Sequence, residues 1–297
     1  MVWVDRKGTV QPLPAPPRSY ATPVLSPDAH LAAVPIGNDV WIYDLTRDTL
    51  TRLTFEGRNL AGTRWTPDGK RVAYSSSRNG AQSLFWRLAD GSGPEERLVT
   101  GQLPRTGSFT PDGRTLIYTD NAPNSAADIW VLPLEGDRKP RVFLQTPFSE
   151  TTPRLSPDGR WVAYISNESG RNEVYVRPFP GPGGKWQIST EGGTGIDWSP
   201  KGNELFYRTG PSAERMMAVD IQTQPAFRAG KPRLLFLAPK AAASALAGIG
   251  ADYSVAPDGQ RFLMIRAKEQ QAAFPNQINV VFNWFEELKR RVPMGGR

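Results

Sequence analysis

Six copies of a short phrase built on Pro-Asp-Gly recur along this 297-residue chain, and no other feature constrains its fold as strongly. The prolines of the six copies stand at positions 27, 67, 111, 157, 200 and 257, so successive copies are 40, 44, 46, 43 and 57 residues apart. A period of about 40–45 residues is typical of four-stranded propeller blades, and some helical repeats share it. The residues within each period must therefore decide between strands and helices.

Those residues favour strands. Proline presets the backbone for the first central position of a tight turn, aspartate accepts hydrogen bonds from nearby backbone N–H groups, and glycine tolerates a positive φ. Each phrase therefore predicts a chain reversal between two extended segments. The predicted turn residues are Pro27, Asp28, Pro67, Asp68, Gly69, Pro111, Asp112, Gly113, Pro157, Asp158, Gly159, Pro200, Gly202, Pro257, Asp258 and Gly259.

The segment after each turn carries a large apolar residue at a fixed place. Eight residues after the Ser, Thr or Ala of the phrase stand Tyr74, Tyr118, Tyr164 and Tyr207 in four of the copies. The residues around them are rich in β-branched and aromatic types, which predicts second strands that pack their tyrosines between neighbouring repeats. Further apolar runs follow in most repeats. Four antiparallel strands in each of six repeats predict an all-β fold, a six-bladed β-propeller.

The two ends of the chain complement each other. Residues 1–17 have the pattern of outer strands without inner partners, whereas the last repeat has inner strands, a third strand expected at 279–283 and no clear fourth. We therefore expect strands from both termini to close the ring. The expected organisation is a single domain over 1–297, with a closing strand and linker at 1–17 and a tail at 286–297. The six blades are expected at 18–57, 58–101, 102–147, 148–191, 192–238 and 239–285.

Composition excludes several kinds of site. The chain has no cysteine and one histidine, so a disulfide scaffold, a Cys-ligated metal and a multi-histidine metal site are impossible within it. No apolar run is long enough to span a membrane, and the residues before the first predicted strand lack the charged-then-apolar pattern of a leader, so we expect no signal peptide here. The net charge of +7 is interspersed along the chain, which does not favour nucleic acid binding. We expect a monomer without a cofactor.

The repeat phrase resembles that of the TolB-like propellers, a WD-like family, over nearly the whole chain. Longer phrases at 2–6, 12–17, 175–186, 227–232 and 283–289 resemble propeller regions attached to bacterial serine/threonine protein kinases. The chain contains none of the kinase catalytic motifs. The resemblance implies a propeller that acts as a sensor or interaction module. It also implies a location outside the cytoplasm if the chain continues upstream of Met1, and the residues alone leave the compartment unknown.

Polar residues on the predicted inner strands are the candidate ligand-binding residues. Arg64, Arg154 and Asp197 stand two residues before the Ser or Thr of their turns, each next to a large apolar residue. Alternation along a strand places the apolar neighbours between blades and these polar residues on the opposite face. Buried charges there must be paired or hydrated. Two interpretations stay open, namely a polar central channel lined by these residues and a structural Arg–Asp pair between blades.

A binding role without catalysis is the leading functional prediction. The turn aspartates are expected to cap backbone groups rather than to ligate a metal, and the sequence has no nucleophile elbow or phosphate-binding loop. The loops between second and third strands vary freely and should share one end of the ring with the connections between blades. We expect a protein or peptide to bind there, and Asn121, Ser149 and Glu150 are the residues chosen to test that face. The alternatives are a propeller that binds a small ligand or a divalent cation, an enzyme that uses channel residues, and the non-catalytic half of a prolyl-peptidase-like enzyme.

Overall fold

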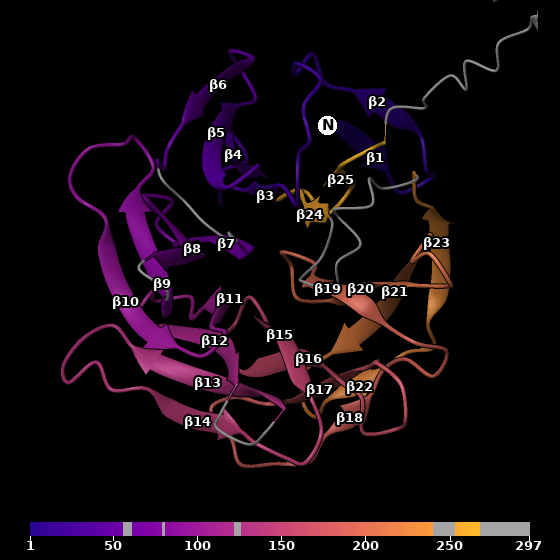
Figure 1. Cartoon of the computed structure of the whole chain (residues 1–297). Helices are drawn as coiled ribbons and strands as arrows, with labels where there is room; N and C mark the ends of the chain where they lie inside the picture. The colour runs from indigo at the N-terminus through magenta and orange to yellow at the C-terminus, as the bar shows by residue number, and fades with distance from the viewer. Residues whose placement is uncertain (56–60, 79–80, 122–125, 240–252, 268–297) are drawn as a thin grey trace, which may run out of the picture. The chain divides into compact units, whose positions relative to one another are not determined.

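The computed structural model describes residues 1–55, 61–78, 81–121, 126–239 and 253–267 (Figure 1). The chain divides into two compact units, Met1–Ala267 and Lys268–Arg297, and all described residues belong to the first. The third strand expected at 279–283 and the tail at 286–297 therefore lie outside the described residues. None of the described segments forms a helix with the length and apolarity that a membrane crossing requires.

The described residues form six antiparallel sheets, as the repeats predict. The first sheet comprises β3 (Val24–Leu25), β4 (Leu31–Ile36), β5 (Asp39–Asp44) and β6 (Thr49–Arg52). The second comprises β7 (Ala61–Trp65), β8 (Arg71–Arg78), β9 (Ala81–Leu88) and β10 (Glu96–Gly101). The third comprises β11 (Arg105–Phe109), β12 (Thr115–Asn121), β13 (Ala127–Pro133) and β14 (Arg141–Leu144).

The fourth and fifth sheets continue the same order. The fourth comprises β15 (Glu150–Leu155), β16 (Trp161–Ser166), β17 (Glu173–Pro178) and β18 (Trp186–Gln187). The fifth comprises β19 (Thr194–Trp198), β20 (Glu204–Thr209), β21 (Arg215–Gln222), β22 (Arg228–Ala229) and β23 (Arg233–Leu237). In this sheet β21 is long enough to pair with β22 at one end and with β23 at the other, so β23 provides the usual fourth strand.

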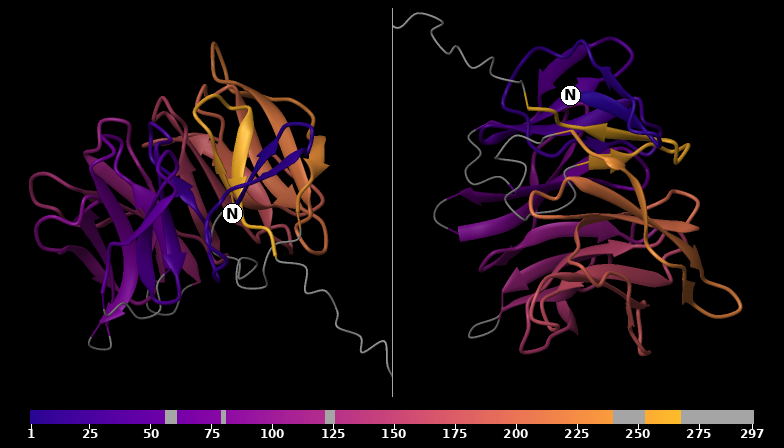
Figure 2. Two further views of the ribbon diagram at one scale, coloured as in Figure 1. Left: turned by 90° about the horizontal axis from the view of Figure 1, so that it is seen from above. Right: turned by 90° about the vertical axis from the view of Figure 1, so that its right-hand side faces the viewer.

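The sixth sheet is built from both ends of the chain, as expected. Its order is β2 (Val10–Pro12), β1 (Val2–Asp5), β25 (Arg261–Met264) and β24 (Tyr253–Val255). The indigo N-terminal strands lie beside the yellow C-terminal ones in both views of Figure 2, and Val2 is in register with Met264. The N-terminus thus supplies the third and the fourth strand of this blade. The prediction that residues 279–283 supply the third strand of this blade is wrong, because β1 occupies the position beside β25.

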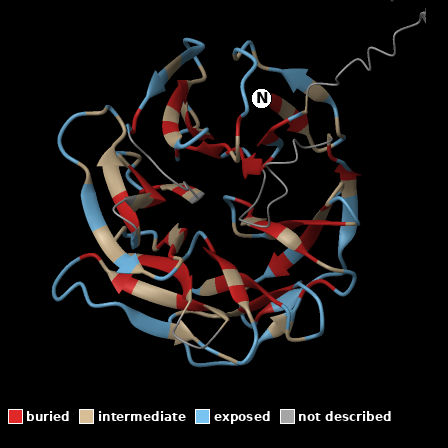
Figure 3. Ribbon diagram, viewed as in Figure 1, coloured by how far each residue is buried: buried red, intermediate tan, exposed pale blue. Residues whose placement is uncertain are grey.

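The inner strands of the six sheets contact one another in a closed cycle, β3, β7, β11, β15, β19, β24 and again β3. Buried side chains gather into six apolar clusters, and each cluster combines residues from two neighbouring sheets. Buried segments, in red in Figure 3, alternate with intermediate ones along the strands. Because each blade buries one face against the blade before it and the other against the blade after it, the protein is a closed six-bladed propeller.

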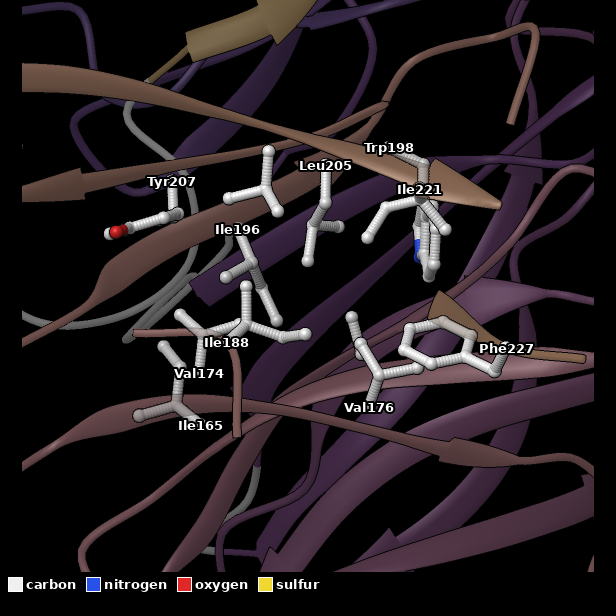
Figure 4. Packing of buried hydrophobic residues seen from close by; sticks show 12 residues of the cluster. Ile165, Val174, Val176, Ile188, Ile196, Trp198, Leu205, Tyr207, Ile221 and Phe227 are labelled. Carbon is white, nitrogen blue, oxygen red and sulfur yellow. The ribbon is translucent and has the colours of Figure 1, made fainter. Parts of the chain in front are cut away.

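The cluster between the fourth and fifth sheets illustrates this packing (Figure 4). Val174 and Val176 from β17 lie opposite Leu205 from β20, with Trp198 and Phe227 at one end of the cluster. The second-strand tyrosines, Tyr74, Tyr118, Tyr164 and Tyr207, are buried in four different clusters, which confirms their predicted role in packing between blades.

Candidate functional site

The Pro-Asp-Gly turns occupy one end of the sheets, which we call the turn face. Asp28 accepts hydrogen bonds from the Ser26 hydroxyl at 2.6 Å and from the His30 backbone N–H at 3.1 Å. These two hydrogen bonds lower the pKa of Asp28, with the hydroxyl contributing most. The same pair of bonds recurs at Asp68, Asp112 and Asp158. The carboxylates therefore serve as local acceptors that hold the turns in place.

The opposite end, the loop face, holds the loops between second and third strands together with the connections between blades. Five large apolar side chains are exposed among the described residues. Phe55 at 54% and Phe148 at 41% exposure lie in these connections, and Leu237 at 65% is the last residue of β23, at the end of that strand that reaches the loop face. The other two, Val142 and Leu234, lie in the outer strands β14 and β23. None of the five lies in a Pro-Asp-Gly turn, so the exposed apolar surface is unequal between the two faces.

The four inner strands β7, β11, β15 and β19 share an irregularity that alternation does not predict. In β11, β15 and β19 the register against the second strand shifts immediately before the polar candidate position, and in β7 it shifts one residue earlier, between Ala61 and Thr63. In three of them a residue with positive φ sits at the shift, namely Gly62, Thr152 and Gly195. A bulge of this kind bends the strand and redirects the side chain that follows it. Ser108, Arg154 and Asp197 occupy the positions directly after a shift, whereas Arg64 follows Thr63, which has already resumed regular pairing with Tyr74.

Two of the candidate residues meet at one backbone oxygen. Arg64 Nε donates to the carbonyl oxygen of Gly107 at 2.8 Å, and Arg154 Nη1 donates to the same oxygen at 2.9 Å. The two arginines come from blades two and four, and Gly107 belongs to the blade between them. We call Arg64, Arg154 and the Gly107 carbonyl the arginine cluster. Arg154 is only 5% exposed, whereas Arg64 and Asp197 keep part of their surface accessible.

The repulsion between the two guanidinium groups makes the electrostatic energy of this cluster unfavourable. Since both donors reach one oxygen, the two charges lie on the order of 6 Å apart, which at an effective dielectric constant of about 20 costs about 3 kcal/mol. Desolvation lowers the pKa of Arg154 well below its usual value, and the charge of Arg64 lowers it further. Desolvation also lowers the pKa of Arg64, while Asp197 raises it. The cluster therefore carries a local excess of positive charge.

Asp197 is near the arginine cluster but does not neutralise it directly. Its Oδ1 accepts a hydrogen bond from the Trp198 backbone N–H at 3.1 Å. Within the described part of the chain, no ion pair joins Asp197 to Arg64 or Arg154. The Arg–Asp pair, one of the two interpretations left open by the sequence, is thus not formed among these residues; two arginines share a carbonyl instead, and the carboxylate acts through its charge.

Gly107 is the residue that sequence reasoning missed. A methyl group at its Cα would lie 2.4 Å from the carbonyl oxygen of Ile117 and 2.7 Å from Pro153 Cγ, so only glycine fits. The sequence signal is a glycine inside a strand pattern, which often marks a close approach of two backbones. Here it allows β15 to pack close to β11 and presents the carbonyl to both guanidiniums.

Hydrogen bonds join the inner strands of neighbouring blades at several other junctions. Trp65 Nε1 donates to the carbonyl of Val24 at 2.8 Å, and Trp198 Nε1 donates to the carbonyl of Arg154 at 3.0 Å. The Ser108 hydroxyl accepts from the Leu155 N–H at 2.8 Å, and the Ser254 hydroxyl accepts from the Leu25 N–H at 3.1 Å. Ser108 and Ser254, at positions equivalent to Arg64 and Arg154, therefore connect blades.

Glu150, chosen from the sequence as a test position on the loop face, is not a surface residue. It is 1% exposed, and its Oε1 accepts from the Thr146 hydroxyl at 2.6 Å and from the Ser166 hydroxyl at 3.3 Å. Burial raises the pKa of Glu150, and the charges of Asp128 and Glu168 raise it further. Its side chain is directed into the fold, and this rules it out as a contact for a partner. Asn121 and Ser149 are partly exposed.

Comparison with known proteins extends this picture. No family model matches the chain. An uncharacterized protein of Agrobacterium fabrum is 29% identical over 156 residues, covering 48% of this chain and 52% of that protein. A tricorn protease homolog of Streptomyces coelicolor is 32% identical over 114 residues, covering 37% of this chain and 11% of that protein. The chain thus spans about half of the first relative's length and about a tenth of the second's.

A solved structure gives the fold comparison. The structure of a TolB-type protein from Agrobacterium tumefaciens matches with a TM-score of 0.71 and 17% identity, covering 88% of this chain and 95% of that one. The fold is that of a TolB-like propeller. At this identity the likeness concerns the arrangement of strands and not the residues of a site. Among the residues that the structure describes, no three His, Asp or Glu side chains group closely enough to hold a metal ion.

Proposed function

We propose that this propeller is a non-catalytic binding module that docks a protein or peptide on its loop face. The observation that carries the proposal is the placement of Phe55 and Phe148, which are exposed in connections between blades on that face, and of Leu237, which is exposed at the end of β23 beside it. Exposed aromatic and large aliphatic side chains are the usual anchors of protein interfaces. Rigid strands beneath the connections reduce the entropy that binding would otherwise cost.

The resemblance to kinase-attached propellers and to TolB-like propellers fits this proposal. A sensor or interaction module needs a rigid scaffold with connections that vary from blade to blade, and the repeats supply both. The loop face differs between blades in length and composition, whereas the turn face repeats nearly the same residues six times. Specific recognition is therefore proposed for the loop face, since loops on a rigid scaffold are where binding residues concentrate.

A second candidate function is favoured by the similarity to the tricorn protease homolog. In that case the propeller would serve a peptide-cleaving enzyme, either as its non-catalytic half or through polar residues on its inner strands. Incubating the purified chain with an unfolded casein substrate tests whether it cleaves peptides alone. Cleavage that persists through further purification steps would favour this candidate over the binding module.

A pair of double variants tests the proposed binding face. Phe55→Ser with Phe148→Ser removes apolar anchors from the loop face, and Val142→Ser with Leu234→Ser removes equally exposed side chains from the outer strands β14 and β23. Each protein is immobilised and exposed to extract of the organism that encodes it, and cross-linked partners are identified by mass spectrometry. We expect the first variant to lose partners that the second retains. Equal capture by both variants would exclude the loop face as the docking surface.

A further inference from the structure

We propose that the arginine cluster, Arg64 and Arg154 around the Gly107 carbonyl, is a binding site for a carboxylate group. The proposal is independent of docking on the loop face, because it concerns different residues and a different kind of contact. Its basis is a pair of guanidiniums from non-neighbouring blades that converge on one neutral oxygen.

The first argument is the imbalance of charge. Two positive charges share a single uncharged acceptor, and no carboxylate of the described residues forms an ion pair with either of them. Buried charges are normally paired, because desolvation without a counter-charge is unfavourable. Asp197 offsets part of the excess through its field without contacting the guanidiniums. The cluster is therefore a place where an added negative charge is strongly favoured.

The second argument is the supply of hydrogen-bond donors. Arg64 uses Nε for the Gly107 carbonyl, and both of its terminal nitrogens remain without an acceptor among the described residues. Arg154 uses Nη1 for two carbonyl oxygens, those of Gly107 and Pro153, and its buried Nε has no partner. A guanidinium presents its N–H groups in a planar fork that matches the two oxygens of a carboxylate.

The third argument is access combined with rigidity. Arg64 and Asp197 are partly exposed, so solvent reaches the cluster, while Arg154 is almost fully buried. Gly107 fixes the shared oxygen, since its lack of a side chain lets Pro153 pack directly against it. A site with one accessible and one buried guanidinium, both held by the same atom, is organised before a ligand arrives. Preorganisation of this kind favours affinity.

Two titrations on the full chain provide the test. The arginine Nε–H signals are followed by NMR while sodium acetate replaces sodium chloride at constant ionic strength. Triglycine and triglycine amide are then compared in the same way, because only the first has a free terminal carboxylate. We expect acetate to shift the Arg64 and Arg154 signals in a saturable manner. Shifts with triglycine but not with its amide identify a peptide C-terminus as an accepted source, and shifts with acetate alone identify a small free carboxylate.

Two variants with opposite expected effects distinguish acetate binding at the arginine cluster from a general effect of the protein's positive charge. Arg64→Met is expected to weaken acetate binding at least tenfold. Asp197→Asn is expected to tighten it several-fold, because it removes a competing negative charge while keeping the oxygen that accepts from Trp198. The second variant keeps the test decisive if the first does not fold. Unshifted signals with every carboxylate, or an affinity unchanged by Asp197→Asn, would overturn the proposal.

Discussion

Replacing Gly107 with alanine tests how closely the third and fourth blades pack. The added methyl group would lie 2.4 Å from the Ile117 carbonyl oxygen and 2.7 Å from Pro153 Cγ. Overpacking of this kind costs about 1–3 kcal/mol. The strand must also move its carbonyl away from Arg64 and Arg154, and each hydrogen bond to a charged group contributes about 1.5–3 kcal/mol. With one of these two hydrogen bonds lost, we expect a total loss of about 3–6 kcal/mol in the free energy of unfolding.

Thermal unfolding followed by circular dichroism measures this loss. For a domain of this size each kcal/mol lowers Tm by about 2–4 °C, so Gly107→Ala should lower Tm by roughly 6–24 °C. Gly184→Ala is the matched control, because a methyl group there meets no atom within 4 Å and its φ is not positive. We expect the control to melt at or slightly above the wild-type temperature. If the two variants melt together, the close approach between β11 and β15 is not as described.

Substitutions of Glu150, Arg6 and Ser108 give three further predictions. The pKa of Glu150 is raised above the usual 4.5, so ionisation of this side chain destabilises the fold as pH rises from the unfolded-state pKa through the folded-state pKa. Glu150→Gln should therefore raise Tm at pH 7, and this gain should disappear below about pH 4. An equal gain in Tm at both pH values would contradict burial of the charge as the cause. Arg6 donates hydrogen bonds to both carboxylate oxygens of Glu204 and to the Gly259 carbonyl. Arg6→Met should therefore lower the free energy of unfolding in urea by about 1–3 kcal/mol. A urea midpoint equal to that of the wild type would show that this link between blades does not stabilise the fold. Ser108→Ala leaves the Leu155 N–H without its acceptor. We expect faster amide hydrogen exchange at Leu155 and a loss of about 1–3 kcal/mol in the free energy of unfolding. An unchanged exchange rate at Leu155 would argue against this hydrogen bond.

The fold was predictable from the sequence because its signals are local and repeated. The turn phrase fixes where each sheet reverses, and the distance from the turn to Tyr74 or Tyr118 fixes the register of the second strand. Pairing between the termini was predictable from the complementary gaps at the two ends. The position of β1 beside β25 was not predictable, because a strand pattern does not show which of several candidate strands pairs with a given neighbour.

The site was predictable only in part. Alternation selected Arg64 and Arg154 as polar residues on inner strands, but the bulges that precede them leave no pattern in one sequence. Their meeting at Gly107 depends on the curvature of the whole ring, which brings together blades that are not adjacent. Glu150 was misjudged for a related reason: a charged residue at a predicted loop edge is normally exposed, whereas here the hydroxyls of Thr146 and Ser166 allow it to be buried.

The pairing of β1 with β25 has a consequence for synthesis on the ribosome. Val2 is synthesised before its partner Met264, which is added more than two hundred and fifty residues later. At about 5–20 residues per second, the first strands wait on the order of 10–50 s for the strands that complete their blade. Throughout that interval β1 and the face of the first blade that packs against the sixth lack their apolar partners in the growing chain. A nascent-chain chaperone is thus most needed at the N-terminal end, well before the last blade has been translated.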